Sequence, residues 1–234
     1  MIVSINQPAY LPWLGYFHRI AVSDAHVVLD HAQFEKNSFT NRNKIRTAAG
    51  WCWLTVPIKT AGKFGDLPIN QVGIANEKAW AVKHWQTLRF NYSKAPFFAQ
   101  HSGFFDGIYA RRWDRLADLA GEITRYLLSA FGIRTKLYFS SQMNVSGKKD
   151  ELVLNLCREI GATEYLSGPL GRNYLREGLF TQHKIAVRYD DYRHPTYPQV
   201  YPQFEPYMAA VDLLFNAGPA SREILLESQH PITL

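Results

Sequence analysis

The sequence predicts an α/β protein with a Rossmann-like, mostly parallel sheet and a mainly helical lobe inserted in the middle third, at about 60–140. Two observations lead to this fold class: strands and helices alternate at both ends of the chain, and the strongest helical periodicity lies between them. With 234 residues and 47% hydrophobic side chains, the chain can bury a large core, so we expect one domain over 1–234.

The beginning of the chain carries the clearest topological signal. Residues 2–6 are apolar enough for a buried strand, and two prolines within 7–12 then force a loop. Apolar side chains recur at helical spacing over 13–20, and 25–30 is a second apolar run. A strand, a short helix and a strand at this spacing form a βαβ unit, and such units build parallel sheets.

The remaining elements follow from apolar periodicity and from helix end signals. Strands are expected at 51–58, 164–167 and 185–192, and helices at 77–92, 114–131, about 147–160, 208–215 and 222–226. The segment 94–112 is aromatic and interrupted by Pro96, Gly103 and Gly107, and we expect it to be irregular.

The composition limits the classes of ligand and partner that we expect the protein to bind. The net charge is +6 and the pI is near 9.3, which suits an anionic small molecule such as a nucleotide or nucleotide-sugar, or a membrane surface. No nucleic-acid-binding motif occurs, and no apolar run is long enough for a transmembrane segment. Cys52 and Cys157 stand alone with no metal-ligand spacing, and the N-terminus does not resemble a signal peptide. We therefore expect a cytoplasmic protein without a metal site, and leave its cofactor and oligomeric state open.

The first polar region, 6–18, lies between the first strand and the first helix. In open α/β sheets ligands bind at this edge. The candidates for substrate binding are Asn6, Gln7, Tyr10, Trp13 and Tyr16, the aromatic ones by stacking on a base or sugar. The alternative is a rigid turn with aromatic side chains packed beneath it.

The second polar region, 30–46, follows the second strand. Arg42, Lys44 and Arg46 alternate, so on a strand they would share one face and could hold a phosphate, with Asn41 and Asn43 facing the other way. Candidate binding residues here are Gln33, Asn41, Arg42, Asn43, Lys44 and Arg46, and Asp30 is a candidate catalytic carboxylate. The alternative is a solvated strand edge protected by charge.

Two further regions follow later strands. Ser167 and Gly168 begin a glycine-containing loop that could present backbone N–H groups to an anion, although a turn without a ligand is as consistent. His194 is a candidate general base, helped by Asp30 or Asp191, and the alternative is a structural hydrogen-bonding histidine. Tyr197 and Gln199 complete the candidate binding residues.

These regions together resemble the WbqC-like protein family over nearly the whole chain. The most specific matches are Gln7-Pro8-Ala9-Tyr10-Leu11-Pro12-Trp13-Leu14-Gly15-Tyr16-Phe17, Asn41-Arg42-Asn43-Lys44-Ile45, Tyr165-Leu166-Ser167-Gly168 and His194-Pro195-Thr196-Tyr197-Pro198-Gln199. Members of this family accompany genes for O-antigen and other surface polysaccharides. The resemblance implies a transferase of bacterial surface polysaccharide (lipopolysaccharide) biosynthesis that transfers an acyl or aminoacyl group, such as glycine, to a nucleotide- or lipid-linked sugar.

The layout of the first unit is also similar, more distantly, to nucleotidylyltransferases of the HxGH type. Trp13-Leu14-Gly15-Tyr16 occupies the HxGH position, so both histidines of that motif are replaced. Two alternatives to the transferase follow. One is an adenylating or nucleotidyl-transferring enzyme with a modified site, and the other is a non-catalytic nucleotide-sugar binding protein.

Overall fold

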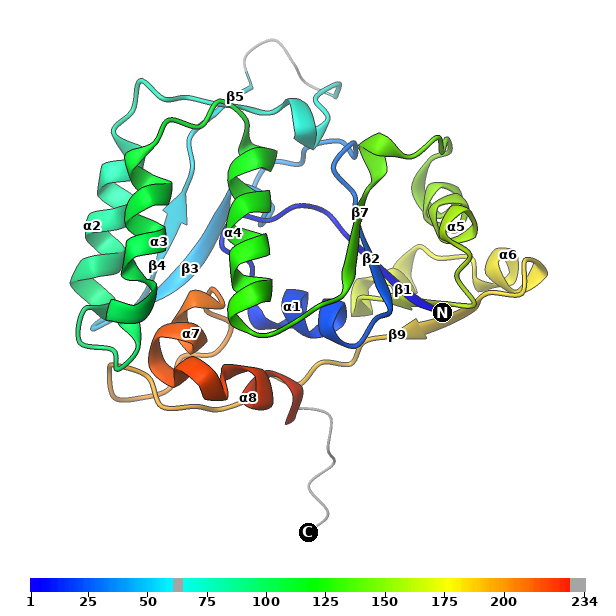
Figure 1. Cartoon of the computed structure of the whole chain (residues 1–234). Coiled ribbons are helices and arrows are strands. Elements are labelled where there is room, and N and C mark those ends of the chain that lie inside the picture. Colours follow the sequence, from blue (N-terminus) through cyan, green and yellow to red (C-terminus); the bar gives the residue numbers. More distant parts are fainter. Residues whose placement is uncertain (61–64, 228–234) are drawn as a thin grey trace.

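The computed structural model describes residues 1–60 and 65–227, and a five-stranded sheet lies in the right half of the molecule as drawn in Figure 1. The strands are β1 (Ile2–Asn6), β2 (Ala25–Val28), β7 (Lys136–Phe139), β8 (Glu164–Ser167) and β9 (Ala186–Tyr189), in the order β7-β2-β1-β8-β9. Every pairing in this sheet is parallel. The predicted Rossmann-like α/β class is therefore confirmed.

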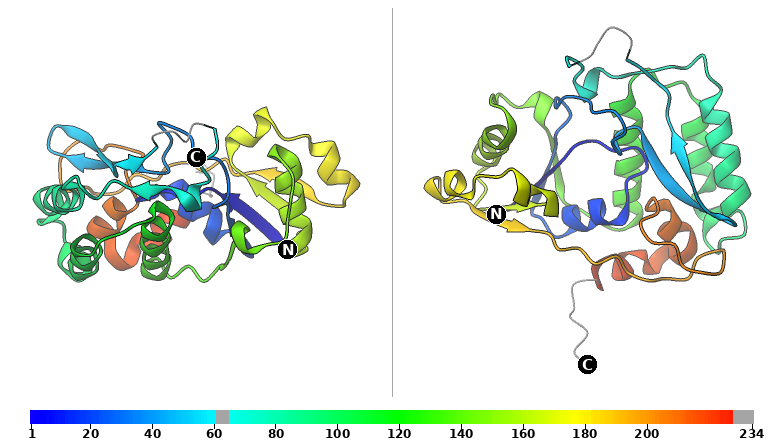
Figure 2. Two further views of the ribbon diagram at one scale, coloured as in Figure 1. Left: turned by 90° about the horizontal axis from the view of Figure 1, so that it is seen from above. Right: turned by 180° about the vertical axis from the view of Figure 1, so that it is seen from behind.

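Helices cover both faces of the sheet (Figure 2). α1 (Leu14–Ala21) lies on one face, where the ring of Tyr16 meets that of His26 on β2. On the other face, α5 (Lys149–Ile160) and α6 (Glu177–Gln182) form a separate apolar cluster with the strands. This cluster includes Val3, Ile5, Val27, Leu156, Cys157, Tyr165 and Phe180. Because side chains alternate along β1, Val3 and Ile5 face α5 and Ser4 faces α1.

The chain order creates a topological switch point between β1 and β8. From β1 the chain continues to β2 on one side, and from β8 it continues to β9 on the other side. In open α/β sheets, ligands bind at such a point, outside the carboxyl ends of the strands. The strand ends at this edge are Asn6, Val28, Phe139, Ser167 and Tyr189.

The middle of the chain adds two small hairpins and three helices. The hairpins pair β3 (Arg42–Thr47) with β4 (Gly50–Thr55) and β5 (Ile58–Lys59) with β6 (Gly73–Ile74). The helices are α2 (Trp80–Tyr92), α3 (Phe98–Ala110) and α4 (Leu116–Ala130). The C-terminal helices α7 (Val211–Ala217) and α8 (Ser221–Glu227) pack near α3 and α1, respectively.

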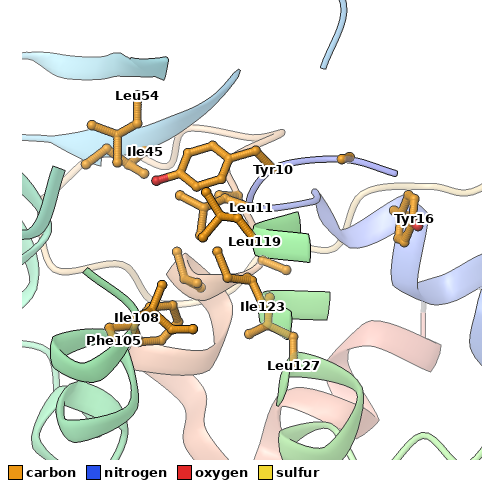
Figure 3. Close-up of a cluster of buried hydrophobic side chains, with 14 of the residues drawn as sticks. Tyr10, Leu11, Tyr16, Ile45, Leu54, Phe105, Ile108, Leu119, Ile123 and Leu127 are labelled. Carbon is orange, nitrogen blue, oxygen red and sulfur yellow. The ribbon is translucent and has the colours of Figure 1, made fainter. Parts of the chain in front are cut away.

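One large core joins these elements. Tyr10 and Leu11 of the first loop are fully buried between the β3–β4 hairpin and the helices (Figure 3). Figure 3 shows them with Ile45 and Leu54 of the hairpin, Phe105 and Ile108 of α3, and Leu119, Ile123 and Leu127 of α4. The aromatic loop after β1 is therefore part of the core as well as of the sheet edge.

The expectation for 94–112 was wrong, because α3 is a regular helix there. Phe98, Phe105 and Tyr109 are buried along it, and an added side chain at Gly103 or Gly107 would meet nothing within 4 Å. The tertiary packing of one aromatic face thus overrides the low helix propensity of two glycines on the exposed side. The parallel edge strand β7 had no counterpart among the predicted elements. None of the helices in 1–60 and 65–227 is long and apolar enough to cross a bilayer.

Candidate functional site

A pocket of about 400 Å³ lies above the carboxyl ends of β2 and β7, beside α4. Its wall includes Pro8 and Tyr16 from the first loop and helix, Asp30 after β2, Asn70, Arg125 of α4 and Ser141 after β7. The volume and the mixture of apolar and polar groups are typical of small-molecule sites. Two of the predicted site residues, Tyr16 and Asp30, line this pocket.

Asp30 is held rigidly by the segment that follows β7. Ser140 Oγ donates a hydrogen bond to Oδ1 (2.9 Å), Ser141 N donates to the same oxygen (2.8 Å), and Ser141 Oγ donates to Oδ2 (2.6 Å). Because the Ser140 hydroxyl proton points to Asp30, the contact of His31 Nδ1 with Ser140 Oγ (2.6 Å) is a donation by the histidine. Asp30 thus presents a fixed carboxylate and an oriented Ser141 hydroxyl at the pocket wall.

Asn70 adds an unsatisfied group to the same wall. Its backbone N–H donates to Asp30 O (2.8 Å), which fixes its position relative to the carboxylate. Its side-chain Oδ1 is buried and has no hydrogen-bond partner among residues 1–60 and 65–227. A buried amide oxygen without a donor is costly, so a ligand hydroxyl or amine that donated to it would gain affinity.

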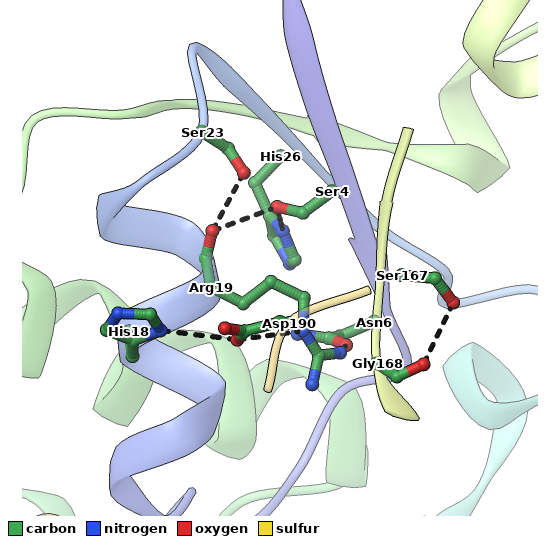
Figure 4. A network of polar contacts seen from close by, with 9 residues as sticks. All are labelled: Ser4, Asn6, His18, Arg19, Ser23, His26, Ser167, Gly168 and Asp190. Atoms are coloured by element: carbon green, nitrogen blue, oxygen red, sulfur yellow. Dashed lines mark hydrogen bonds and ion pairs between the residues drawn. The ribbon is translucent and has the colours of Figure 1, made fainter. Parts of the chain in front are cut away.

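A second polar cluster lies at the switch point, on the other side of β1 (Figure 4). Arg19 of α1 extends across the end of β1, where Nη1 donates to Asn6 Oδ1 (2.5 Å) and Nε lies 3.6 Å from Asp190 Oδ2. His18 Nδ1 lies 3.2 Å from the same carboxylate oxygen. The guanidinium also lies against Gly168, at the end of β8. Asn6 and Gly168, both predicted to bind substrate, are thereby brought together with Ser167, whose hydroxyl donates to Gly168 O (3.1 Å).

His194 lies in a separate aromatic cluster. The centre of its ring lies within 6.3 Å of the ring centres of Tyr192, Tyr197, Phe204 and Tyr207. Nδ1 donates to Pro195 O (2.8 Å), whereas the buried Nε2 has no partner within the described parts of the chain. Burial lowers the pKa of this histidine below its ordinary value.

Trp13 belongs to the same cluster, since its ring meets those of Tyr192 and Tyr207. The first and fourth polar regions of the sequence are therefore neighbours in space. Asp191, predicted to help His194, is exposed and forms an ion pair with Arg172 (3.3 Å). The tryptophan at the first HxGH position thus packs away from the pocket, and the tyrosine at the last position, Tyr16, lines it.

The three cations of β3 do not form one exposed face. Arg42 and Lys44 point outward, with the guanidinium 4.5 Å from the ring centre of Trp53 and the ammonium 4.7 Å from that of Trp51. Arg46 is 2% exposed, and its guanidinium donates to four backbone carbonyls, those of Thr47, Gly50, Pro202 and Gln203. Arg46 therefore ties the hairpin to the segment before α7.

Most predicted amide and phenol groups are used inside the protein. Asn41 Nδ2 donates to Val56 O, Asn43 Nδ2 donates to Leu11 O, and Gln33 accepts from Leu67 N and donates to Phe34 O. Tyr197 and Gln199 both donate to Asp212 Oδ2 (2.8 Å each), and Tyr92 donates to the other oxygen. The Tyr10 hydroxyl is buried against His84 and Tyr109, and Gln7 is half-buried. These contacts hold the loops that frame the site.

Three site residues were missed by the sequence analysis. Arg19 follows the noted aromatic helix residues, and a cation within that short helix was the available signal. Ser141 follows a strand that was itself not predicted, and Asn70 lies in a 3₁₀ turn (Ile69–Gln71) that periodicity does not detect. Each acquires its meaning only from neighbours far away in the sequence.

An open parallel sheet with helices on both faces and a pocket at its carboxyl edge defines an α/β protein of the Rossmann-like class. The chain belongs to the WbqC-like protein family, whose model matches residues 7–224. It is 36% identical over 225 residues to the uncharacterized protein Rv1507c of Mycobacterium tuberculosis, covering 95% of this chain and 96% of that protein. No solved structure matches the chain.

Proposed function

We propose that the protein is a transferase of surface polysaccharide biosynthesis that moves an acyl or aminoacyl group onto an activated sugar. The observation that carries this proposal is the pocket above β2 and β7, where Asp30, Ser141 and Asn70 present a carboxylate, a hydroxyl and an unpaired amide oxygen. The pathway in this proposal is the one that the resemblance to the WbqC-like family implies. An amino sugar is the acceptor that such a set of acceptor atoms fits best.

Asp30 is the proton acceptor in this proposal. The acceptor amine would donate an N–H to Ser141 Oγ, whose own proton already points to Asp30 Oδ2 (2.6 Å). As the amine nitrogen attacks the acyl carbon, its proton would pass to Ser141 and the Ser141 proton to Asp30, while the bond from the acyl carbon to its carrier breaks. His194 does not line the pocket, and we assign it to positioning the aromatic cluster rather than to proton transfer.

Asn70 would recognise a hydroxyl or amine of the sugar. The substitution Asn70→Leu removes the unpaired oxygen and retains the backbone contact with Asp30. We expect the free protein to keep or gain thermal stability, because a buried unsatisfied group is lost. Affinity for the sugar should fall by up to about tenfold, the value of one hydrogen bond.

The test begins with a thermal-shift screen of UDP-, dTDP- and GDP-sugars, ATP, CTP and acyl-CoA, each with and without Mg²⁺. A ligand at 100 times its Kd should raise Tm by roughly 5–10 °C for a chain of this length. The best ligand is then assayed for turnover with acyl donors in the wild type, Ser141→Ala and the matched exposed-serine control Ser129→Ala. We expect binding in all three and a large loss of kcat only in Ser141→Ala.

Other outcomes separate the alternatives. Stabilisation by ATP or CTP with Mg²⁺, together with pyrophosphate release, would replace the proposal with the modified nucleotidyltransferase. Binding of a nucleotide-sugar without turnover by any acyl donor would favour the non-catalytic binding protein. Full activity of Ser141→Ala would remove the proton relay.

A further inference from the structure

Two buried hydrogen-bond donors lack a partner at the switch point between β1 and β8, within the described residues. The guanidinium of Arg19 carries five N–H bonds, and its side-chain acceptors in the described chain are Asn6 Oδ1 and Asp190 Oδ2. Arg19 Nε and Asn6 Nδ2 are both buried, and neither has a hydrogen-bond partner in 1–60 or 65–227. Since Arg19 Nη1 needs Oδ1, the amide of Asn6 cannot be turned to hide its donor.

Asp190, the carboxylate beside Arg19, does not accept a hydrogen bond from either of these two donors. Asp190 is shared, because His18 Nδ1 lies nearer to Oδ2 (3.2 Å) than Arg19 Nε does (3.6 Å). The side chain of Arg19 is 12% exposed and that of Asp190 is 3% exposed, so little water screens the guanidinium. The neighbouring carboxylate Asp191 is exposed and is paired with Arg172. An arginine this buried, with donors remaining, has the chemistry of an anion-binding group.

The backbone at the end of β8 is shaped around this guanidinium. A Cβ atom at Gly168 would lie 2.8–3.0 Å from three atoms of the Arg19 guanidinium group, its Cζ and both terminal nitrogens. A side chain at this position would force the guanidinium to shift, and Figure 4 shows Gly168, Asn6 and Asp190 gathered around the Arg19 side chain. Asn6 at the end of β1 and Gly168 after β8 therefore both lie against the Arg19 guanidinium.

We infer that the carboxyl ends of β1 and β8 bind a phosphate group of the substrate through Arg19 and Asn6. The ligand class is a diphosphate-bearing compound, since donors from two side chains can be shared between adjacent phosphoryl groups. The phosphate role therefore passes from the cations of β3 to Arg19. This inference rests on the proposed function: with the sugar in the pocket on one side of β1, the diphosphate lies across the end of the strand.

α1 links the pocket to the switch point between β1 and β8. Tyr16 lines the pocket, and Arg19 follows one helical turn later on the same helix. The charge of Arg19 opposes the effect of burial, which raises the pKa of Tyr16. A ligand that extends past Pro8 and the end of β1 would therefore meet both groups.

The probe is inorganic pyrophosphate, titrated at constant ionic strength while Tm is recorded. Asn6→Asp keeps an oxygen for Arg19 Nη1 and puts a negative oxygen in place of the unpaired donor. Gly168→Ala displaces the Arg19 guanidinium from its position beside residue 168. Asn37→Asp is the charge-matched control, because it adds the same charge beside the hairpin cation Arg42, whose Nη2 donates to Asn37 O (2.7 Å).

We expect a saturable rise in Tm for the wild type and Asn37→Asp, and at least a tenfold higher apparent Kd for Asn6→Asp and Gly168→Ala. Without ligand, Asn6→Asp should be as stable as the wild type, because the new carboxylate pairs with Arg19. Absence of a saturable rise in the wild type, or equal affinity in Asn6→Asp, would overturn the inference. A loss of pyrophosphate affinity confined to Asn37→Asp would also overturn it, because the phosphate would then bind at the cations of β3.

The two proposals fail in different ways. If pyrophosphate binds as expected but no sugar compound binds or turns over, the phosphate assignment stands and the transferase proposal falls. If a sugar compound binds, is weakened by Asn70→Leu and is unaffected by Asn6→Asp, the transferase proposal stands and the phosphate assignment falls.

Discussion

The buried imidazole of His26 should make the protein acid-sensitive. His26 is fully buried under α1, its Nδ1 lies 2.8 Å from Ser4 Oγ, and its Nε2 has no hydrogen-bond partner within the described residues. Burial, and then the nearby charge of Arg19, lower its pKa from 6.5 to about 3. His84, buried against Tyr10, has a pKa lowered to about 4, also by burial.

The direction and the size of this change in stability with pH follow from proton linkage. Between about pH 6.5 and the lowered pKa, the unfolded chain binds a proton at each histidine and the folded chain does not, so stability falls as pH falls. The slope is about 1.4 kcal/mol per pH unit for each group, which gives about 2 kcal/mol for His26 between pH 7 and pH 5. His84 contributes a similar amount. For a chain of this length, 2 kcal/mol corresponds to roughly 4–8 °C in Tm.

The assay compares Tm at pH 7 and pH 5 in the wild type and in His26→Asn, with the exposed-histidine variant His183→Gln as control. Whatever Asn costs at pH 7, the difference between the two pH values should shrink by about 2 kcal/mol in His26→Asn and stay unchanged in His183→Gln. An equally large acid drop in His26→Asn would refute the reasoning, since it would mean that His26 titrates normally in the fold.

Three further predictions concern the core. Phe105→Ala, at a fully buried ring, should cost about 3–5 kcal/mol in chemical denaturation, whereas Phe90→Ala, at a ring 82% exposed, should change stability by under about 0.5 kcal/mol. Gly15→Ala would overlap the indole of Trp13 and should cost about 1–3 kcal/mol in the same assay; no loss would mean that the indole is free to move. Cys157, whose pKa burial raises to about 12, should resist iodoacetamide at pH 8 until the protein unfolds, and rapid labelling of the native protein would contradict its burial.

Four of the five strands of the parallel sheet, all but β7, could be predicted because they are short, largely apolar and bounded by prolines, glycines or helices. The strand at 164–167 has the predicted bounds, and 185–192 is longer than the observed β9 because its end leaves the sheet at Asp190. Local propensity failed for α3, whose Phe98, Phe105 and Tyr109 stabilise the helix only once the core exists.

Part of the candidate site could also be anticipated. Its location followed from topology, because polar residues after parallel strands gather at one edge, as Asn6, Asp30 and Ser167 do. Residue type alone could not predict which polar side chains face the site and which stabilise the fold. By residue type, Arg46 is as good a phosphate ligand as Arg19. In the fold, however, its guanidinium donates hydrogen bonds to four backbone carbonyls.

The proposed transferase function depends most directly on the pocket above β2 and β7. Ala117 of α4 lines it, so Ala117→Phe should fill part of its volume, while Ala99→Phe adds the same ring to the exposed side of α3. The measurement is calorimetric titration of both variants with the best sugar compound from the screen. We predict that Ala117→Phe lowers affinity at least tenfold and that Ala99→Phe binds like the wild type. Unchanged affinity in a folded Ala117→Phe would contradict the account, because the substrate would then bind elsewhere.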